Sequence, residues 1–368
     1  MLRWAVPSQG CASKVHSAGT GSCVKLVYTI DPLKDARWTP FVHTHPHASI
    51  FHTRGWLDAL RRTYGYRPVA FTTSDPGGPL SNALLFARVS SWLTGRRIVS
   101  LPFSDHCQPL FHSNDHLQDV LTYLQTETAC QRWGYVEIRP VNGTMSGFHP
   151  VASYRMHRIN LEPSLDEIFQ TFDKDSVRRR ICRAERAGLL EKHGQSEDLL
   201  GAFYKLLILT RRRHRLPPQP YVWFRNLVQS LGDAAEVRVA YTQEQQPIAA
   251  ILNLRFKDAL FYKYGCSDTR YKNLGAMPFL FWRAIQDAKG TGANEFDLGR
   301  SDEDNPGLVA FKDAWTKSAC RLVYWRFPPS PAHHVRSGWA MRVARLLFAH
   351  LPNRALTTAG ELVYPHMG

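Results

Sequence analysis

Residues 261–312 constrain the fold of this chain most strongly, because strand, loop and helix signals follow one another there without a break. An aromatic-rich run predicts a strand, a polar loop follows at 266–276, and Pro278 fits the first turn of an apolar helix. A short strand at 295–298 and a charged loop precede a turn that carries Lys312. A helix that starts directly after a strand and loop presents free backbone N–H groups, which bind anions. The stretch therefore predicts a binding site at the strand ends.

The first half of the chain shows the same order of elements. Three extended segments, a polar loop at 102–109, a helix and two later strands follow one another, as they do in the second half. The predicted strands are 68–72, 83–89, 97–101, 135–139 and 154–161, then 236–242, 247–255, 259–265, 295–298 and 320–327, and the predicted helices include 49–62, 114–132 and 197–213. We therefore expect an α/β (α+β) chain with an internal duplication, in which each module has a mixed, mostly antiparallel sheet flanked by helices.

The chain of 368 residues is long enough for two domains. We divide it into a disordered leader at 1–24, a first module at 25–161, a basic helical segment of the second module at 162–231, the core of that module at 232–328, and an amphipathic tail at 329–368. A weaker alternative gives the leader an organellar targeting role. The tail interleaves Trp339, Met341, Val343, Leu346, Leu347 and Leu351 with Arg336, Arg342 and Arg345. Such a helix lies on an anionic membrane surface or packs against the second module.

Positive charge is concentrated in the middle of the chain. The formal net charge is +15, and residues 174–215 hold twelve Lys and Arg against five Asp and Glu. Asp173 or Asp175 can cap a helix whose apolar side includes Val177, Ile181 and Ala184, and Gly188 can end it. The remaining face carries arginines, which fits a solvated surface or a phosphate-bearing partner. Because a second basic cluster ends the helix at 197–213, we favour a phosphate-binding groove, with Arg179, Arg183 and Arg212 as candidate ligands.

The seven cysteines are scattered and form no CxxC pair. This spacing predicts a reduced, cytoplasmic setting and argues against a structural zinc site, so we expect no metal. No apolar run approaches the roughly 20 residues that span a bilayer. The loop at 102–109 places Asp105 beside His106 and Cys107, which suggests a nucleophile or a metal site, but substrate binding by Ser104 and Asp105 or a simple side-chain turn is favoured over either.

Several ordered sequence blocks resemble a known family. KDSVRRRICRAERAGL, LTRRRHRLPPQP, YKYGCSD, EFDLGRS and GLVAFKDAW are similar to blocks of the FemAB-like aminoacyltransferases, in the branch associated with exopolysaccharide and exosortase gene clusters. LPFSDHCQPL and GWLDALRRTYGYRP extend the resemblance over about residues 45–327. The resemblance implies tandem modules of the Gcn5-related N-acetyltransferase (GNAT) type. It also implies an acyl or aminoacyl group moved from a carrier to an amine of a cell-envelope, peptidoglycan or polysaccharide precursor.

The resemblance also suggests site residues. Lys312, in GLVAFKDAW, matches a lysine that the family uses near the reacting carbonyl or the carrier phosphates, while a surface lysine is the alternative. Asp297 and Arg300 lie at a strand end and its following turn and either hold the acceptor or fix their own loop. Asp297 is also a candidate catalytic residue, because a carboxylate could accept the proton of the amine if burial raised its pKa. Tyr264 and Ser267 point toward the same region if the strand alternates regularly, with Tyr262 on the face of Tyr264. The site would then lie in a groove between the modules.

The carrier is left open by the sequence. Residues 272–277 lack the last small residue of the Arg/Gln-x-x-Gly-x-Gly/Ala pattern, and the second module has no inserted pair of long charged helices. Acyl-coenzyme A and aminoacyl-tRNA are therefore both retained as co-substrates, with no tightly bound cofactor and a phosphate-bearing or lipid-linked acceptor. Two alternatives are a catalytically inactive module that binds RNA or a phosphorylated glycan, and a peripheral membrane scaffold. In each case we expect a cytoplasmic protein, with peripheral contact to the inner face of the membrane as an option.

Overall fold

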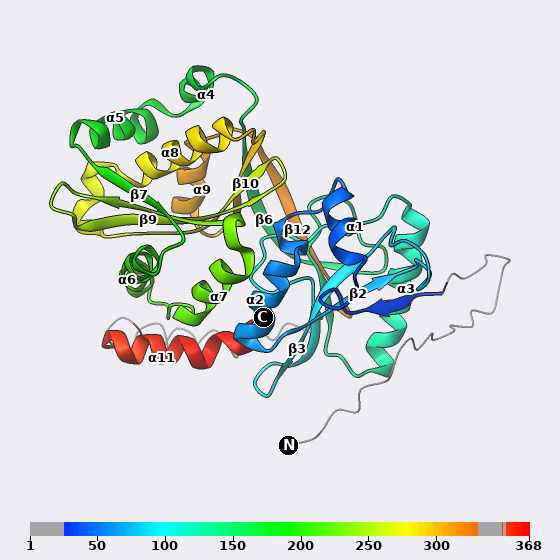
Figure 1. Cartoon of the computed structure of the whole chain (residues 1–368). Coiled ribbons are helices and arrows are strands. Elements are labelled where there is room, and N and C mark those ends of the chain that lie inside the picture. The colour runs from blue at the N-terminus through cyan, green and yellow to red at the C-terminus, as the bar shows by residue number, and fades with distance from the viewer. Residues whose placement is uncertain (1–25, 330–347, 349–350) are drawn as a thin grey trace. The chain divides into compact units, whose positions relative to one another are not determined.

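The computed structural model describes residues 26–329, 348 and 351–368, which form two compact units (Figure 1). Unit 1 extends to Ala152 and takes up the chain again at Val323, and it also includes residues 366–368. Unit 2 spans Ser153–Leu322 and includes the C-terminal helix as far as Pro365. The predicted leader lies outside the described residues.

Unit 1 contains a mixed sheet with one helix packed on its main apolar face. Strands β1 to β4 are antiparallel neighbours in order, β4 pairs in parallel with β5, and β5 pairs antiparallel with β12. The strands are β1 (Tyr28–Ile30), β2 (Arg67–Thr72), β3 (Leu84–Ser91), β4 (Gly95–Val99), β5 (Val136–Ile138) and β12 (Ala319–Phe327), and the helices are α1 (Trp38–Thr44), η1 (Ile50–His52), α2 (Arg54–Tyr64) and α3 (Asn114–Cys130). Leu121 and Leu124 of α3 pack on Phe71 and Phe86 of the sheet.

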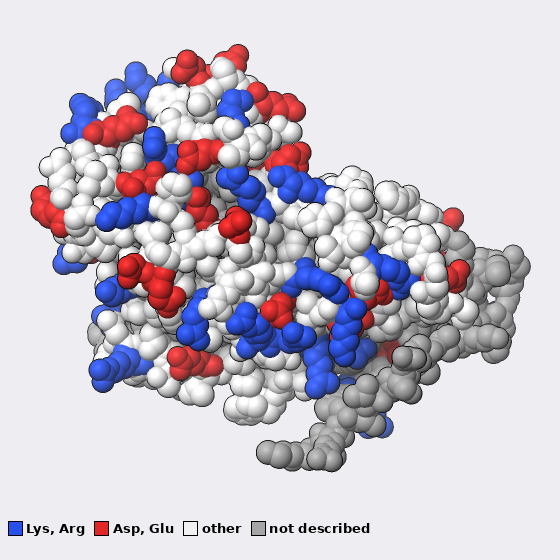
Figure 2. All heavy atoms as spheres, viewed as in Figure 1, with Lys and Arg blue, Asp and Glu red and all other residues white. Residues whose placement is uncertain are grey.

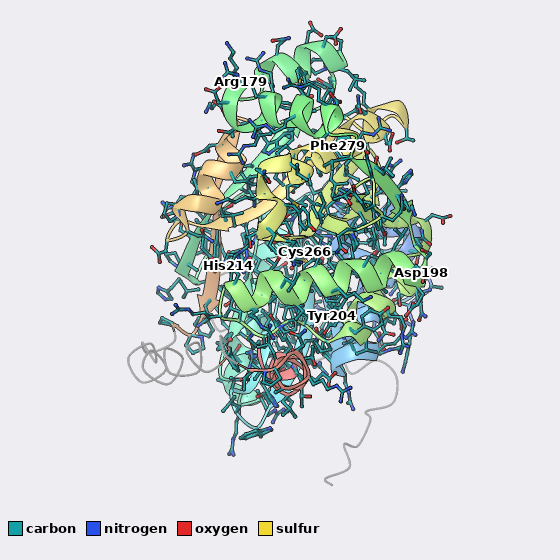
Figure 3. All side chains as sticks on the ribbon, turned by 90° about the vertical axis from the view of Figure 1, so that its left-hand side faces the viewer. Arg179, Asp198, Tyr204, His214, Cys266 and Phe279 are labelled. Atoms are coloured by element: carbon teal, nitrogen blue, oxygen red, sulfur yellow. The ribbon has the colours of Figure 1, made fainter. Side chains whose placement is uncertain are left out.

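Unit 2 contains a second mixed sheet with helices on both faces. Its order is β7-β8-β9-β10-β11-β6, and only the β10–β11 pair is parallel. The strands are β6 (His149–Asn160), β7 (Leu190–Gly194), β8 (Ala235–Tyr241), β9 (Pro247–Phe256), β10 (Ala259–Ser267) and β11 (Glu295–Asp302). The helices are α4 (Leu165–Thr171), η2 (Lys174–Arg178), α5 (Arg179–Arg186), α6 (Glu197–Arg213), α7 (Tyr221–Leu231), η3 (Gly232–Ala234), η4 (Thr269–Leu274), α8 (Ala276–Gly290), α9 (Pro306–Asp313), α11 (Asn353–Val363) and η5 (Tyr364–His366). Helices α5 and α8 pack together on one face, and α6 and α7 cover the other (Figure 3).

The duplication and the fold class predicted from the sequence are confirmed, with one difference in connectivity. In each unit an antiparallel meander leads through a loop and a helix to a strand parallel to the last meander strand. The predicted modules are continuous in sequence, whereas the last strand of each unit comes from the other half of the chain. Strand β12 pairs with β5 in unit 1, and β6 pairs with β11 in unit 2. Both strands mix apolar and charged residues and are flanked by turns, so their composition alone does not select a partner.

The basic helix of unit 2 begins and ends as its sequence predicts. The carboxylate of Asp173 accepts the backbone N–H groups of Asp175 and Ser176, which caps the helical segment. Gly188 has a φ of +63°, and the bonds from its N–H to Glu185 and from Leu189 to Ala184 form a Schellman motif. The apolar residues Val177, Ile181 and Ala184 of this helix are buried in the unit 2 core.

Most of the predicted amphipathic tail lies outside the described residues, including Trp339, Met341, Arg336, Arg342 and Arg345. The described part is α11, which packs against the loop that follows α6. Leu356 is fully buried, and a side chain at Gly360 would meet the carbonyl oxygen of Pro218, so the helix lies close to that loop. Within the described ranges, no helix is long and apolar enough to cross a membrane.

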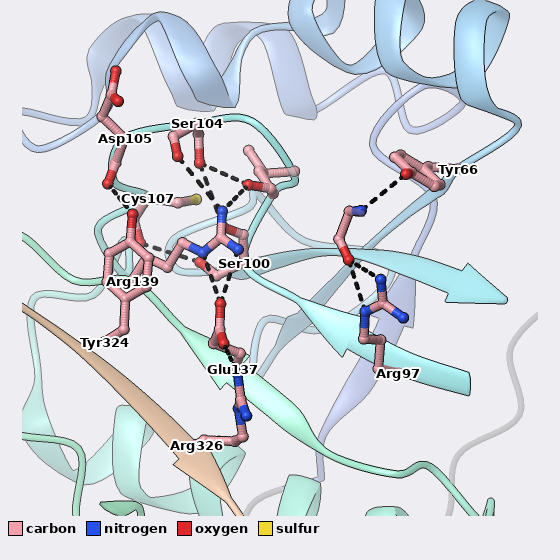
Figure 4. A network of polar contacts seen from close by, with 12 residues as sticks. Tyr66, Arg97, Ser100, Ser104, Asp105, Cys107, Glu137, Arg139, Tyr324 and Arg326 are labelled. Carbon is pink, nitrogen blue, oxygen red and sulfur yellow. Dashed lines mark hydrogen bonds and ion pairs between the residues drawn. The ribbon is translucent and has the colours of Figure 1, made fainter. Parts of the chain in front are cut away.

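A buried carboxylate joins the two late strands of unit 1 (Figure 4). Glu137 of β5 is 5% exposed and pairs with Arg139 and with Arg326 of β12. Arg139 donates in turn to the carbonyl oxygens of Leu101 and Ser104, which fixes the loop after β4. Burial on its own would raise the pKa of Glu137, but the two arginines outweigh it and hold the pKa below its ordinary value of 4.5.

Replacing Glu137 with Gln is expected to lower the free energy of unfolding of unit 1 by about 3–5 kcal/mol at pH 7, because two arginines lose their buried partner. Since folding lowers the pKa of Glu137, its stabilising contribution is present above pH 4.5 and is lost as the pH falls through the folded-state pKa. Urea denaturation between pH 3 and pH 7 tests this. The exposed Asp115→Asn variant is the control, and equal stability of E137Q and D115N at pH 7 would contradict the prediction.

Candidate functional site

Strands β10 and β11 pair at one end and diverge at the other. Their parallel register covers only Ala259–Phe261 against Glu295–Asp297. Beyond it, β10 continues to Ser267 on β9, and β11 continues to Asp302 on β6. The register of each strand shifts where they separate, between Tyr262 and Tyr264 in β10 and between Asp297 and Arg300 in β11. A bulge bends a strand and increases its twist, so two bulges side by side account for the divergence.

Lys312 of α9 fixes the irregular part of β11. Its side chain is 2% exposed, and Nζ donates to the carbonyl oxygens of Gly299 at 2.9 Å and Arg300 at 2.8 Å. Gly299 has a φ of +71°, a conformation in which a side chain is disfavoured. The ammonium group therefore donates hydrogen bonds to two carbonyl oxygens that would accept backbone N–H groups in a regular strand. The lysine therefore lies beside the strand divergence and is buried, whereas a surface lysine was the alternative interpretation of the sequence. Its role near the reacting carbonyl or the carrier phosphates stays a prediction.

Asp297 and Arg300 lie at the two ends of the same bulge. One carboxylate oxygen of Asp297, which is buried, accepts the backbone N–H of Gly299 at 2.6 Å, and the other lies 3.8 Å from Nε of Arg158. The guanidinium of Arg300 lies over the ring of Tyr154, 4.1 Å from its centroid. Both side chains therefore help to shape the end of β11.

The bulge in β10 separates two tyrosines that regular alternation would place together. The ring of Tyr262 packs on Phe281 of α8, 4.7 Å away. The hydroxyl of Tyr264 accepts the indole N–H of Trp223, in α7, at 3.0 Å. The prediction that the two share a face is therefore wrong, because the extra residue reverses the alternation. Ser267 ends the strand, and its backbone N–H and carbonyl both bond the hydroxyl of Thr210 in α6.

The loop between β10 and α8 approaches the basic helix α5. Gly275 precedes α8 with a φ of +77°, and a Cβ there would lie 2.2 Å from the carbonyl oxygen of Arg180. The guanidinium of Arg183 donates to the carbonyl of Asn273 in the same loop at 3.2 Å. Lys272 is exposed beside it. The start of α8, with its free N–H groups, therefore has cations around it and can hold an anion.

The three predicted basic ligands do not form one cluster. Arg183 reaches the loop before α8, whereas Arg179 points away from it and pairs with the exposed Asp175 at 2.5 Å. Arg212 donates to the carbonyl oxygen of Leu351 and to the side chain of Asn353, so it holds the C-terminal segment. Figure 3 shows α5, with Arg179, and α6, with His214 at its end, on opposite sides of the sheet. A single groove lined by both helices is therefore not formed within unit 2.

The two candidates in unit 1 belong to a fixed loop (Figure 4). The hydroxyl of Ser104 is buried and donates to the carbonyl oxygen of Leu101 at 2.8 Å. The carbonyl oxygen of Asp105 accepts the hydroxyl of Tyr324 at 2.6 Å. These contacts give both residues a place in the turn, as one of the sequence interpretations proposes. Whether they also touch a substrate stays a prediction.

Cys107 lies 3.4 Å from His52. A nucleophilic cysteine needs a thiolate, and this pair does not favour one. Nδ1 of His52 accepts the backbone N–H of Ser49, and Nε2 lies 3.0 Å from the carbonyl oxygen of Gln108, so Nε2 carries the proton. Burial lowers the pKa of His52 to about 4 and raises the pKa of Cys107 to about 12. Both groups are therefore neutral at pH 7, and the thiol is unreactive.

One histidine next to Lys312 was not predicted from the sequence. His157 of β6 is fully buried, lies opposite the β11 bulge, and its Nε2 is 2.9 Å from a carboxylate oxygen of Asp313. Burial lowers the pKa of His157 in spite of this carboxylate. Only its place opposite a strand irregularity distinguishes it, which no local pattern predicts. Among the described residues, no group of three or more His, Cys, Asp or Glu is arranged to hold a metal ion.

Comparison with protein families identifies the second half of the chain. Residues 173–313 match the family described as acetyltransferase (GNAT) domain. This range runs from the cap of the basic helix to the last residue of α9, so it includes the diverging strands, the loop before α8 and Lys312. No curated protein matches the chain in sequence.

Three solved structures share the fold of most of the chain. The crystal structure of FemX has a TM-score of 0.63 at 14% identity, covering 84% of this chain and 97% of that one. The C-terminal domain of a putative lysylphosphatidylglycerol synthetase from Agrobacterium fabrum has a TM-score of 0.51 at 14% identity, covering 86% and 96%. A tandem GNAT protein from the clavulanic acid biosynthesis pathway has a TM-score of 0.52 at 10% identity, covering 82% and 97%. Residues 173–313 therefore match the GNAT domain family that the resemblance predicts, within a fold shared with FemX and with a tandem GNAT protein. The association with exopolysaccharide and exosortase gene clusters stays a prediction.

Proposed function

We propose that this protein transfers an acyl or aminoacyl group from a carrier to an amine of a cell-envelope or polysaccharide precursor. The observation that carries the proposal is the divergence of β10 and β11, together with a helix start whose preceding loop carries Lys272 and is contacted by Arg183. The amine attacks the carbonyl carbon of the acyl group, and a C–N bond forms. The C–S bond of a thioester or the C–O bond of an ester breaks, and the carrier leaves with a proton.

The geometry assigns different parts of the reaction to different elements. The parallel register of β10 and β11 ends at Phe261 and Asp297, and the strands diverge beyond these residues, so we place an extended carrier arm between them. Hydrogen-bond donors at this position would stabilise the oxyanion that forms on the attacked carbonyl. The start of α8, together with Arg183 and Lys272, would hold carrier phosphates. Asp297, at the β11 edge, would position the amine and receive its proton.

Both carrier classes fit this division. Acyl-coenzyme A and aminoacyl-tRNA each bring phosphates and a reactive carbonyl ester or thioester, and either would act as a co-substrate and leave with each turnover. FemX and the putative lysylphosphatidylglycerol synthetase domain share the fold, which supports an aminoacyl carrier and an envelope acceptor. The GNAT domain supports acyl-coenzyme A. Analysis of co-purified ligands by mass spectrometry would distinguish the carriers.

Replacing Lys312 with Met is expected to lower kcat at least 100-fold, because the end of β11 moves when two carbonyl oxygens lose their donor and misplacement of about 1 Å costs a factor of that order. The KM for the carrier should change less than threefold, since the carrier phosphates bind at α8. Amide formation from each carrier with an amine panel, followed by mass spectrometry, measures this effect.

Lys317→Met is the matched control, because Lys317 is exposed and donates only to the carbonyl oxygen of Asp313 among the contacts described for it. The melting temperature of both variants separates lost activity from lost folding. Full activity of a folded K312M protein would reject the site. Absence of any amide product from the unmodified protein with both carriers would reject the function.

Replacing Arg183 with Ala is expected to raise the KM for the phosphate-bearing carrier about tenfold, the usual effect of losing one charge-assisted contact. Arg179→Ala removes the same charge from the same helix, but Arg179 pairs with Asp175 on the exposed side. It should therefore leave KM within a factor of two. Steady-state kinetics at 50 and 300 mM salt measures both variants, and equal effects would show a general charge effect in place of a phosphate contact.

A further inference from the structure

An apolar tip projects from the hairpin that joins β3 and β4 in unit 1. Trp92 is 86% exposed and Leu93 is 61% exposed, the largest values for big apolar side chains in unit 1. Met367, which is 55% exposed, belongs to the C-terminal residues of the same unit, and His366 beside it packs edge-on against the Trp92 ring at 5.4 Å. Exposed apolar side chains are common singly, but adjacent ones on a projecting turn mark an interaction site. We call Trp92, Leu93 and Met367 the apolar tip.

The backbone of this turn is fixed, although its side chains are exposed. The hydroxyl oxygen of Ser91 accepts the backbone N–H groups of Leu93 and Thr94, at 3.1 and 3.0 Å. The hydroxyl of Thr94 donates to the carbonyl oxygen of His366 at 3.1 Å, and Arg97 holds that same oxygen and Gly368. The turn therefore presents Trp92 and Leu93 in a defined direction, which lowers the entropy cost of binding.

Cations lie directly behind the tip. The register of β2, β3 and β4 places Arg67 beside Arg88, and Arg96 beside Ser90, so all three arginines share one face of the sheet. All three are exposed. Burial of part of its side chain lowers the pKa of Arg88, and repulsion from Arg67 and Arg96 adds to this, while Glu127 of α3 opposes it. Figure 2 shows Lys and Arg side chains gathered over β2 and β3.

We propose that the β3–β4 hairpin is a membrane-contact element, in which the apolar tip enters the headgroup region of an anionic bilayer while Arg67, Arg88 and Arg96 contact its lipid phosphates. Tryptophan has an apolar ring with one N–H donor and is enriched at the membrane interface. Cations close behind such a residue add affinity for anionic lipids. The contact requires neither a spanning helix nor the transfer reaction.

A bilayer fits this surface better than a second copy of the chain or another protein. A stable protein interface buries about 800 Å² on each partner, with some 20–30 residues per side. The tip offers three apolar side chains followed at once by like charges, which two copies would bring face to face. An anionic lipid surface compensates those charges and accepts a small apolar wedge without a complementary shape.

Flotation of the full chain with vesicles tests the proposal, using phosphatidylcholine alone and phosphatidylcholine with 30% phosphatidylglycerol. We expect binding to the anionic vesicles only, and at least tenfold weaker binding of the Trp92→Ser/Leu93→Ser variant. Leu190→Ser, which removes an apolar side chain of β7 that is 41% exposed, is the control and should bind like the unmodified protein. With brominated lipids, Trp92→Phe should also lose most of the fluorescence quenching.

The cations are tested by Arg96→Glu and by Lys34→Glu, which change the net charge of unit 1 by the same amount. Lys34 is among the most exposed side chains and lies on a different loop. We expect R96E to weaken anionic vesicle binding by about fivefold per charge lost, and K34E to have little effect. No vesicle binding by the unmodified protein, unchanged binding by W92S/L93S, or equal effects of R96E and K34E would each overturn the proposal. Loss of a dimer in W92S/L93S, without vesicle binding, would assign the tip to a second copy.

Discussion

The candidate site depends on one buried ammonium group. Lys312 satisfies the carbonyl oxygens of Gly299 and Arg300, which the bulge in β11 removes from the regular ladder. An unsatisfied buried carbonyl costs roughly 1–3 kcal/mol, so two of them would favour a regular strand. A regular β11 would continue its pairing with β10 and remove the divergence. The lysine therefore supports the shape of the site whether or not it also contacts a substrate.

Much of the fold was predictable because the stronger elements carry complete local signals. Helix α6 begins after Ser196 and ends at Arg213, as predicted, and β8, β9 and β10 fall within two residues of their expected bounds. The helices α1, α4 and α7 and the strand β7 were not predicted. Helices α1 and α4 have only seven residues, and β7 is mostly exposed. These three elements therefore depend on contacts with residues that are distant in sequence. The pairing of β6 with β11 in unit 2 and of β12 with β5 in unit 1 likewise depends on tertiary contacts.

The site was less predictable than the fold, for reasons that individual residues show. The sequence predicts that Lys312 follows the strand at 295–298, but it predicts neither the strand divergence nor the burial of the lysine, because a lysine in a charged turn is normally exposed. Tyr262 and Tyr264 point to opposite faces of the sheet because of a bulge in β10, and no residue type in this strand predicts that bulge. Arg179 and Arg183 lie on the same side of one helix, one turn apart, and their position along the helix decides which of them reaches the loop before α8.

Several charged groups of the chain are held in internal pairs. Arg238 of β8 is buried and pairs with the largely buried Glu191 and with the partly exposed Glu236 and Asp287. Glu137 of unit 1 is buried and pairs with Arg139 and Arg326. Arginines held in such pairs are not available to a partner, whereas the exposed arginines of α5 and of the β3–β4 hairpin can attract anions. Anionic partners are therefore expected at these two surfaces and not at the interior pairs.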